Sequence, residues 1–342
     1  MSTSPRPGMR DRLLDGLQLR RAPGRPTQVH LSVTDRCFLP CLHCDIWKNT
    51  AEDLPTQFWL DAIDRLGAWC APAGLNLVGG EPLLRKDLEQ LMARAVTRGF
   101  QVSFNTNGWL MTPARAAAIA AAGTSVAYVS LDGARAETVD HSRGRVGSFD
   151  KARAAIKLLR ATGGPRVVIA SILHTGNAAE VPALLSLVRD EGLELVVQPL
   201  YQSFGPAPYD PHWWRSSPFF PRTAEALTQL DTALDLLTVE RLRGGPVQNA
   251  AAQLQAMKQH FRAPDADNLQ SCRAGHSDIS VDPQGRLRLC YFLDPIGHLD
   301  EVLPLHLQWD RPEALRRRWQ VSRCARHCNL LNCNFARDEA EG

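Results

Sequence analysis

The chain has 342 residues, which is enough for one large domain or for two of ordinary size. Hydrophobic residues make up 44% and charged residues 22%, the balance of a globular protein with a sizeable core. The net charge of +3 gives no global argument for a nucleic acid or an anionic membrane as partner. The basic start lacks the apolar segment of a secretory signal, and no run has the roughly 18 consecutive apolar residues that cross a bilayer. We therefore expect a cytoplasmic protein with no nucleic-acid and no membrane partner.

From residue 29 the chain alternates short β-rich runs with segments of helical period. The β-rich runs are apolar and rich in Val, Ile or Leu, as buried parallel strands are. The expected strands are 29–34, 75–80, 101–108, 126–133, 166–173 and 193–200. The expected helices between them are 56–69, 87–98, 113–122, 149–161 and 179–191. Thr112 and Ser148 stand at two of the helix starts, where their side chains would cap the first turn.

Six consecutive β-α repeats predict a parallel sheet with right-handed crossovers. The repeats alone do not separate an open doubly wound sheet from a partial barrel. In either fold the functional loops lie at the carboxyl ends of the strands. Polar motifs lie at or just after the carboxyl ends of the first four expected strands, namely CFLPCLHC (37–44), GGEP (79–82), NTNG (105–108) and SLDG (130–133). The sequence therefore predicts a single site at that end of the sheet.

After residue 200 the pattern changes. Residues 202–221 are dense in proline and aromatic residues and are expected to form a loop or lid, followed by helices over 222–243 and 246–262. We expect four parts: an N-terminal extension (1–28), a β/α core (29–215), a helical linker region (216–267) and a cysteine-rich C-terminal domain (268–342).

Nine cysteines need an explanation in a cytoplasmic chain, because disulfides are rare there. Cys70 stands alone in an apolar helical stretch, where we expect a small buried hydrophobic residue. The others form two groups, Cys37, Cys41 and Cys44 near the start and Cys272, Cys290, Cys324, Cys328 and Cys333 near the end. Clustered cysteines in a reducing compartment indicate metal or redox chemistry.

The first group supplies three thiols, one fewer than a tetrahedral zinc ion or a cubane cluster needs. A zinc site would take its fourth ligand from His43 or Asp45, although ligands packed this close strain a tetrahedron. A [4Fe–4S] cluster is held by one thiolate at each iron, so three cysteines would leave the fourth iron open. Both interpretations stand on the residues alone.

The order of the motifs resembles the radical S-adenosylmethionine (SAM) superfamily. The resemblance rests on C-x3-C-x2-C after the first strand, GGEP after the second, NTNG after the third and VSLDG in the fourth. The run DHSRGRVGSFDKA (140–152) is typical of members that carry a C-terminal SPASM or twitch domain. The resemblance implies a partial (β/α)6 TIM-like barrel with a small cysteine-rich C-terminal domain. It also implies that the open iron chelates SAM, whose cleavage gives a 5′-deoxyadenosyl radical that abstracts a hydrogen atom from the substrate.

Carried over residue by residue, the resemblance assigns the catalytic cluster ligands and part of the SAM site. The three ligands would be Cys37, Cys41 and Cys44. The GGE motif consists of Gly79, Gly80 and Glu81. Its glycines would let bare backbone approach the SAM amino group, and Glu81 could accept a hydrogen bond from that group.

Five further residues are implied as cofactor-binding. Asn105, Asn107 and Ser130 lie at the ends of expected strands and are candidates for the ribose and the carboxylate of SAM. Ser171 on the fifth strand is a further candidate. His43 precedes the last cysteine, where the family usually has an aromatic residue near the adenine, and an imidazole can stack there. Asn107 has an alternative interpretation as part of a plain turn.

The second cysteine group begins in a segment, 277–290, that alternates like a hairpin with a DPQG turn. Gly285 followed four residues later by cysteine resembles the G-x4-C of SPASM and twitch domains. Zinc bound by four cysteines is the serious alternative here, whereas the resemblance favours an auxiliary [4Fe–4S] cluster. Its candidate ligands are Cys272, Cys290, Cys324, Cys328 and Cys333.

The group departs from the full SPASM pattern, which has seven cysteines and two auxiliary clusters. Five thiols suffice for one cluster with one cysteine to spare, and the spare residue is left open among Cys324, Cys328 and Cys333. Arginines surround this run and could raise the cluster potential or dock an acidic electron donor. A solvated helix face is the simpler interpretation of these residues, which are Arg316, Arg317, Arg318, Arg323 and Arg326.

Three functions fit these residues. The first is a radical SAM oxidoreductase or maturase that acts on a peptide or a small molecule, with an auxiliary cluster assisting oxidation or bond formation and a reductase such as flavodoxin or ferredoxin as partner. Residues 1–28 are too few for a peptide-binding domain, which favours a small molecule or a substrate recruited by another protein. The second is a radical SAM epimerase or methyltransferase with a structural auxiliary cluster. The third, of another class, is a non-catalytic zinc-binding protein.

Some further side chains are candidates on placement alone. We expect substrate-side acids or bases among Asp132, Tyr201, Asp294 and His298. Trp213 and Trp214 are expected either to line a pocket or to pack in the interior.

Overall fold

The computed structural model describes residues 24–268 and 270–335. Most of the expected N-terminal extension, residues 1–23, and the last seven residues, 336–342, therefore lie outside the described part. Within it, no helix is long and apolar enough to cross a membrane.

The strands form one sheet in the order β6-β5-β4-β3-β2-β1-β7-β8-β9. Strands β1 to β6 are parallel, and all six correspond to the strands predicted from the sequence. The bounds are Gln28–Thr34 (β1), Gly74–Gly79 (β2), Gln101–Thr106 (β3), Val126–Ser130 (β4), Arg166–Leu173 (β5), Glu194–Pro199 (β6), Asp278–Val281 (β7), Arg286–Arg288 (β8) and Gly297–His298 (β9).

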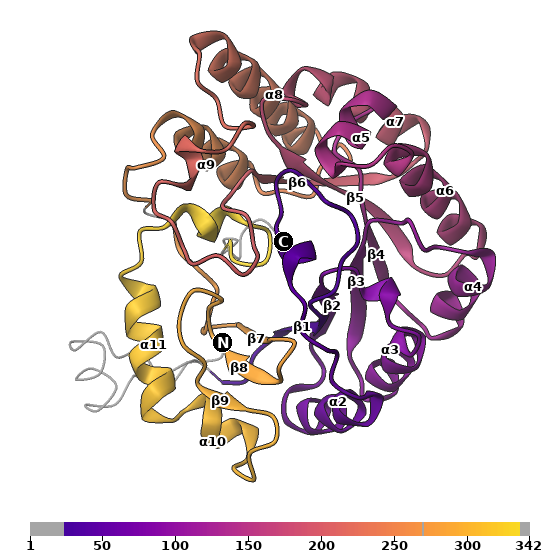
Figure 1. Cartoon of the computed structure of the whole chain (residues 1–342), viewed down its shortest axis with the longest axis vertical. Helices are drawn as coiled ribbons and strands as arrows, with labels where there is room; N and C mark the ends of the chain where they lie inside the picture. The colour runs from indigo at the N-terminus through magenta and orange to yellow at the C-terminus, as the bar shows by residue number, and fades with distance from the viewer. Residues whose placement is uncertain (1–23, 269, 336–342) are drawn as a thin grey trace, which may run out of the picture.

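Helices cover the outer side of this sheet. The α-helices are Thr56–Cys70 (α2), Leu88–Thr97 (α3), Pro113–Ala121 (α4), Ala136–Arg143 (α5), Ser148–Ala161 (α6), Val181–Asp190 (α7), Ala224–Leu242 (α8), Ala251–Arg262 (α9), Leu305–Trp309 (α10) and Pro312–Ser322 (α11). Short 3-10 turns lie at Ile46–Lys48, Pro82–Leu84, Ala178–Glu180, Trp213–Arg215 and His327–Leu330. Figure 1 shows β1 to β6 along an arc with α2, α3, α4, α6 and α7 outside it. The sheet is thus a partial barrel, and the fold class implied by the resemblance is confirmed.

The core fills the space between the strands and the inner faces of these helices. β1 is buried on both faces from Val29 onward, because its neighbours and the covering helices leave no solvent side. In α2, Trp59, Ile63 and Leu66 recur with helical period and are fully buried. Cys70 ends this helix and is buried, as predicted.

One of the two expected helix caps is confirmed and the other is wrong. The Thr112 hydroxyl accepts a hydrogen bond from Arg115 N at the start of α4. Ser148 does not cap α6, because its hydroxyl donates to Arg145 O instead. The cap comes from Asp140 on the preceding helix, whose carboxylate accepts from the backbone N–H of Phe149 at 2.9 Å.

The C-terminal part joins the barrel sheet directly. β7 pairs in parallel with β1, with Gln28 opposite Asp278 and Leu31 opposite Val281. β8 folds back antiparallel to β7, so the predicted hairpin is confirmed, and its turn closes through Gly285 N donating to Asp282 O at 2.8 Å. The pairing with β1 was not predicted. It brings the second cysteine group to the barrel, although the proposed domain boundaries themselves stay a prediction.

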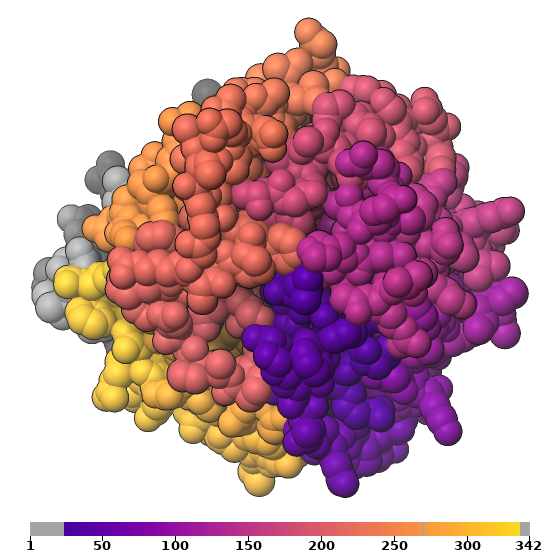
Figure 2. Space-filling view, turned by 45° about the horizontal axis from the view of Figure 1, so that its top comes forward, coloured from indigo at the N-terminus to yellow at the C-terminus, as the bar shows by residue number. Residues whose placement is uncertain are grey.

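The loop after β6 covers the mouth of the barrel. Asp45 N, just past the first cysteine group, donates to Phe204 O at 2.9 Å. A Cβ on Gly205 would lie only 2.6 Å from Asp45 Cβ, so the two segments are in close contact. Figure 2 shows the same meeting on the surface, where the indigo segment after β1 abuts the salmon segment after β6.

Candidate SAM and cluster site

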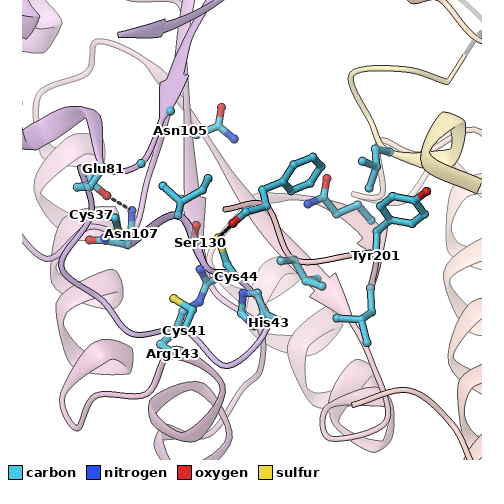
Figure 3. A pocket seen from close by; sticks show the side chains of 18 of the residues that line it. Cys37, Cys41, His43, Cys44, Glu81, Asn105, Asn107, Ser130, Arg143 and Tyr201 are labelled. Carbon is cyan, nitrogen blue, oxygen red and sulfur yellow. Dashed lines mark hydrogen bonds between the residues drawn. The ribbon is translucent and has the colours of Figure 1, made fainter. Parts of the chain in front are cut away.

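A cavity of about 200 Å³ lies at the carboxyl ends of the parallel strands. It opens beside a larger cavity of about 850 Å³, and the two share wall residues that include Asn105, Ser130 and Arg143. The structure brings ten of the predicted site residues to the smaller cavity: Cys37, Cys41, His43, Cys44, Gly79, Gly80, Glu81, Asn105, Asn107 and Ser130. Ser171 lines only the larger one. Figure 3 shows these side chains converging from the ends of separate strands.

The cysteine loop is held on two sides. Leu42 N donates to Ser142 O at 2.9 Å, which ties the loop to the end of α5. A Cβ on Gly144 would lie 2.2 Å from Pro40 O, so only glycine allows α5 to end this close. On the other side Cys44 Sγ faces Phe204 O at 3.9 Å. The loop therefore presents its thiols from a fixed backbone.

Burial keeps these thiols protonated when nothing is bound to them. Desolvation raises the pKa of Cys37 to about 11 and that of Cys44 to about 12. The pKa of Cys41 is also raised by burial, although the nearby Arg143 opposes the shift. A metal deprotonates a coordinating thiol outright, so loading would release protons from this loop.

The glycine pair has a packing role that the sequence did not predict. Gly79 has φ +133°, and a Cβ on it would lie 2.1 Å from Thr34 O. A Cβ on Gly80 would lie 2.2 Å from Arg36 O. Both glycines thus let β2 end directly against the chain that leads into Cys37, in addition to lining the cavity.

Glu81 links the ends of β2 and β3. Its side chain is 1% exposed, and burial raises its pKa. Oε1 accepts from Thr106 Oγ1 at 2.8 Å and from Leu83 N at 3.1 Å, while Oε2 accepts from Asn107 N at 2.8 Å. The carboxylate therefore organises the NTNG turn, beyond the role in receiving the SAM amino group that the resemblance implied.

The two asparagines of that turn differ. Asn107 Oδ1 accepts from Trp109 N at 2.9 Å, so its oxygen is used in the turn, as the alternative interpretation expected. Asn105 Oδ1 is buried and has no hydrogen-bond partner within residues 24–268 and 270–335. A buried acceptor at the cavity wall needs a donor, and the ribose hydroxyls of SAM are donors of the right kind. The residues present thus fit the nucleoside that the family binds.

Arg143 is the site residue that sequence reasoning missed. Its Nε lies 2.7 Å from Asp132 Oδ2, and both side chains are buried. The guanidinium also lies close enough to the Cys41 thiol for each group to shift the pKa of the other. Burial pushes the pKa of Asp132 upward, but the charge of Arg143, the nearby His43 and His174 and the hydrogen bond from Ile172 N together outweigh it, so the net shift is downward. The only signal was its place in the DHSRG run, to which no role had been given.

His43 is a neutral ring in the wall. It is buried, and desolvation together with the charge of Arg143 lowers its pKa to about 3. Its ring centroid lies 6.4 Å from that of His174, with the planes tilted by 32°. Nδ1 has no partner among the described residues. A neutral imidazole that lines the cavity fits the stacking position that the resemblance implied.

The five C-terminal cysteines gather beyond the larger cavity. Every pair among Cys272, Cys290, Cys324 and Cys328 interacts electrostatically. Cys333 interacts with Cys272 and Cys290 and, with Cys290, lines the larger cavity. In the described part of the chain no three His, Cys, Asp or Glu side chains converge on one point to hold a single metal ion. A cubane does not require that convergence, because each thiolate ligates a different iron.

Most of the side chains proposed as acids or bases lie away from both cavities. Asp132 is committed to the buried pair with Arg143. Asp294 is exposed and pairs with Arg317, whereas His298 Nε2 lies 2.7 Å from Gln284 O. Tyr201 does line the smaller cavity. Trp213 and Trp214 line neither cavity and pack against the core, so their packing interpretation holds.

The arginine run also needs one correction. Arg318 is not part of a solvated helix face, because it is 1% exposed on the inner side of α11. Its guanidinium donates to Gly275 O and to Trp309 O, both at 2.6 Å, and so fastens α11 to α10 and to the segment that follows Cys272.

The fold and the thiol-lined cavity together define a β/α-barrel protein with cysteine ligands at the barrel mouth. Residues 31–188 match the radical SAM superfamily. This match confirms the resemblance drawn from the motifs of the chain. Members of this superfamily use a [4Fe–4S] cluster and SAM, which confirms the prediction of these two cofactors.

The relatives extend the comparison over different parts of the chain. The mycofactocin maturase MftC of Mycobacterium tuberculosis is 34% identical over 203 residues, which cover 59% of this chain and 50% of that protein. The chain therefore matches about half the length of this curated relative. The PqqA peptide cyclase of Ruegeria pomeroyi is 26% identical over 332 residues, 91% of this chain and 81% of that protein.

A solved structure shares the fold. Streptococcus suis SuiB, crystallised with S-adenosylmethionine, superposes with a TM-score of 0.67 at 13% sequence identity. The superposition covers 90% of this chain and 70% of SuiB. At this identity it is the partial barrel and its C-terminal extension that are alike.

Proposed function

We propose that the protein is a radical SAM enzyme that cleaves SAM reductively at a cluster held by Cys37, Cys41 and Cys44 and abstracts a hydrogen atom from a substrate in the larger cavity. The observation that carries this proposal is the gathering of three thiols, the GGE backbone and Asn105 Oδ1 around one cavity. Asn105 Oδ1 has no hydrogen-bond partner in the described part of the chain. When bound, a three-cysteine [4Fe–4S] cluster supplies an open iron for SAM and the electron that cleaves it.

This chain's own residues would bind and orient the cofactor. Asn105 Oδ1 accepts from a ribose hydroxyl, and His43 offers a neutral ring to the adenine. Glu81 keeps the NTNG turn in place and accepts from the SAM amino group with a lone pair that the turn leaves open. The loop after β6 closes over the cysteine loop, which helps to exclude water from a reactive radical.

We propose a peptide as the substrate. The PqqA peptide cyclase acts on a peptide, as its name says, and its alignment covers 91% of this chain. The cavity of about 850 Å³ is large enough for a few side chains and reaches from the SAM pocket to the second cysteine group. This reverses the slight preference for a small molecule that the short N-terminal extension suggested. A reductase such as flavodoxin or ferredoxin as electron donor, and a cytoplasmic location, stay predictions.

We propose that the auxiliary cluster is held by Cys272, Cys290, Cys324 and Cys328. A cubane places each thiolate near the other three, and all pairs among these four interact. Cys333 is then the spare cysteine, and it keeps a free thiol on the wall of the substrate cavity.

The position of Cys333 supports a second candidate, epimerisation. Its S–H bond would break to give a hydrogen atom to the substrate radical, and a one-electron donor with a proton would then restore the thiol. Under this alternative Cys333→Ala abolishes the epimer, whereas for an oxidising maturase the same variant still forms product. Product analysis in D2O separates the two outcomes, because only the epimerase places solvent deuterium on carbon.

The experiment that tests the function is anaerobic incubation of the reconstituted, reduced protein with SAM. We expect 5′-deoxyadenosine and methionine in equal amounts, and neither product from the variant with Cys37, Cys41 and Cys44 all changed to alanine. A colourless protein with zinc and no iron would instead establish the non-catalytic zinc-binding alternative. Iron-loaded protein that leaves SAM intact under reduction would refute the proposed function.

A further inference from the structure

Tyr201 connects the smaller cavity with the second cysteine group. It follows β6 by two residues, and its neighbour Leu200 is fixed to the barrel from both sides. Leu200 N donates to Leu173 O at 3.0 Å, and Leu200 O accepts from His260 Nε2 at 2.8 Å. The side chain of Tyr201 then lines the smaller cavity, where Figure 3 shows it opposite the first cysteine loop.

The far end of the same side chain reaches Cys328. Tyr201 and Cys328 are 7% and 5% exposed and belong to one small cluster of packed residues. The rings of Trp213 and Phe292 enclose Tyr201, with centroids at 5.4 and 6.2 Å. A hydroxyl enclosed in this way needs a partner within the protein. Its partners are the Cys328 thiol and the Tyr209 hydroxyl.

The direction of this hydrogen bond follows from the two groups. The phenol of Tyr201 carries one O–H, which can donate. A cysteine that ligates a cluster does so as a thiolate, which has no proton and can only accept. Packing alone would be served equally well by phenylalanine. Packing therefore explains the ring of Tyr201 but not its hydroxyl.

We propose that Tyr201 is a positioning residue that donates a hydrogen bond to Cys328 Sγ and thereby raises the reduction potential of the auxiliary cluster. The inference rests on the proposed function, in which Cys328 is a ligand of that cluster. Hydrogen bonds to the ligating sulfurs stabilise the more negative, reduced state and are one determinant of iron–sulfur potentials. Tyr201 also lines the SAM cavity. Its side chain would therefore fix the position of Cys328 relative to the cavity in which the radical forms.

The test is a redox titration of the reconstituted full-length protein, followed by electron paramagnetic resonance. Tyr201→Phe keeps the ring and removes only the donor. We expect the auxiliary cluster of this variant to titrate at a more negative potential than in the wild type. The potential of the first cluster and the iron content should be unchanged, because neither depends on this hydroxyl.

Tyr209→Phe is the matched control, since it removes a hydroxyl from the same cluster but not the one that faces sulfur. Its auxiliary potential should stay close to that of the wild type. An unchanged potential in Tyr201→Phe, an equal shift in Tyr209→Phe, or a wild type with a single cluster would each overturn the inference. Formation of 5′-deoxyadenosine, measured on the same samples, shows separately whether the proposed function holds.

Discussion

At the residue scale, the buried side chain of Arg143 interacts with two groups. Its guanidinium compensates the Asp132 carboxylate, which otherwise would be a lone buried charge. It also faces Cys41, whose thiolate form it favours. Asp132 Oδ1 in turn accepts from Ile172 N at 2.9 Å, so the pair joins the cysteine loop to α5 and β5. Removing either partner leaves the other charge without compensation.

Arg143→Gln should therefore lower the free energy of unfolding by roughly 3–5 kcal/mol, the cost of an unpaired buried charge. Arg166→Gln is the control, because Arg166 is 53% exposed and its partner Glu194 is 34% exposed, and such surface pairs contribute about 0–1 kcal/mol. Denaturant unfolding measures both variants. Equal losses in the two would contradict a special role for the buried pair.

The same pair predicts a pH dependence. The folded-state pKa of Asp132 is lowered from its ordinary value of 3.8, so its contribution to stability is present above that value. The contribution is lost as the pH falls through the folded-state pKa, where the carboxylate takes up a proton. The stability advantage of the wild type over Arg143→Gln should hold at neutral pH and shrink below about pH 4. Unfolding curves at several pH values check this, and an advantage that grows on acidification would exclude it.

Gly80→Ala tests the close approach of β2 to the cysteine loop. The added Cβ would meet Arg36 O at 2.2 Å, so the chain leading into Cys37 must move. We expect loss of iron from the first cluster and destabilisation well above the control. Gly192→Ala is that control, since its Cβ would meet nothing within 4 Å and only the positive φ costs about 1 kcal/mol. Full iron content in Gly80→Ala would show that the contact is not needed.

At the scale of elements, the strands were predictable because a strand buried on both faces needs an unbroken apolar run. α5 was missed since its eight residues, AETVDHSR, carry almost no apolar period. It is held by Glu180, whose carboxylate accepts from Ala134 N at 2.9 Å and pairs with Arg135. At α11 the sequence suggested a solvated helix face, but Arg318 occupies a core-facing position where a pattern search expects a hydrophobic residue. Tertiary contacts, which one sequence does not display, decide both helices.

The start of α6 gives a prediction at this scale. Asp140 accepts from Gly147 N at 2.7 Å and from Phe149 N at 2.9 Å, which satisfies two free N–H groups of the first turn. Asp140→Ala should cost about 1 kcal/mol of unfolding free energy, as other cap deletions do. Ser148→Ala, at the residue that the sequence suggested, should cost less. The opposite order in denaturant unfolding would show that the serine is the cap after all.

For the whole molecule, the continuous sheet explains how two cysteine groups more than 200 positions apart come to line two cavities that share part of their walls. β7 extends the barrel sheet beside β1, the strand that leads into the first cysteine loop. The first cysteine group could be predicted from the sequence because its three cysteines lie within eight consecutive residues. The roles of Arg143 and Tyr201 could not, because each acts on a cysteine far away in the sequence.

The ligand assignment predicts iron contents at this scale. Wild-type protein should hold about eight irons, two cubanes of four, and Cys333→Ala should keep them all. Cys290→Ala should fall towards four, because it removes a thiol that interacts with each of the other three proposed ligands. Iron and sulfide analysis checks both variants. Loss of four irons in Cys333→Ala would mean that Cys333 is a ligand and that another cysteine is spare.

The open iron at Cys37, Cys41 and Cys44 is tested most directly by electron paramagnetic resonance of the reduced protein with and without SAM. Cys290→Ala simplifies the measurement, because only the first cluster should remain in that variant. The account predicts that SAM changes the spectrum of this cluster, and that the signal is absent when Cys37, Cys41 and Cys44 are replaced by alanine. A first-cluster spectrum that stays the same at saturating SAM would contradict it.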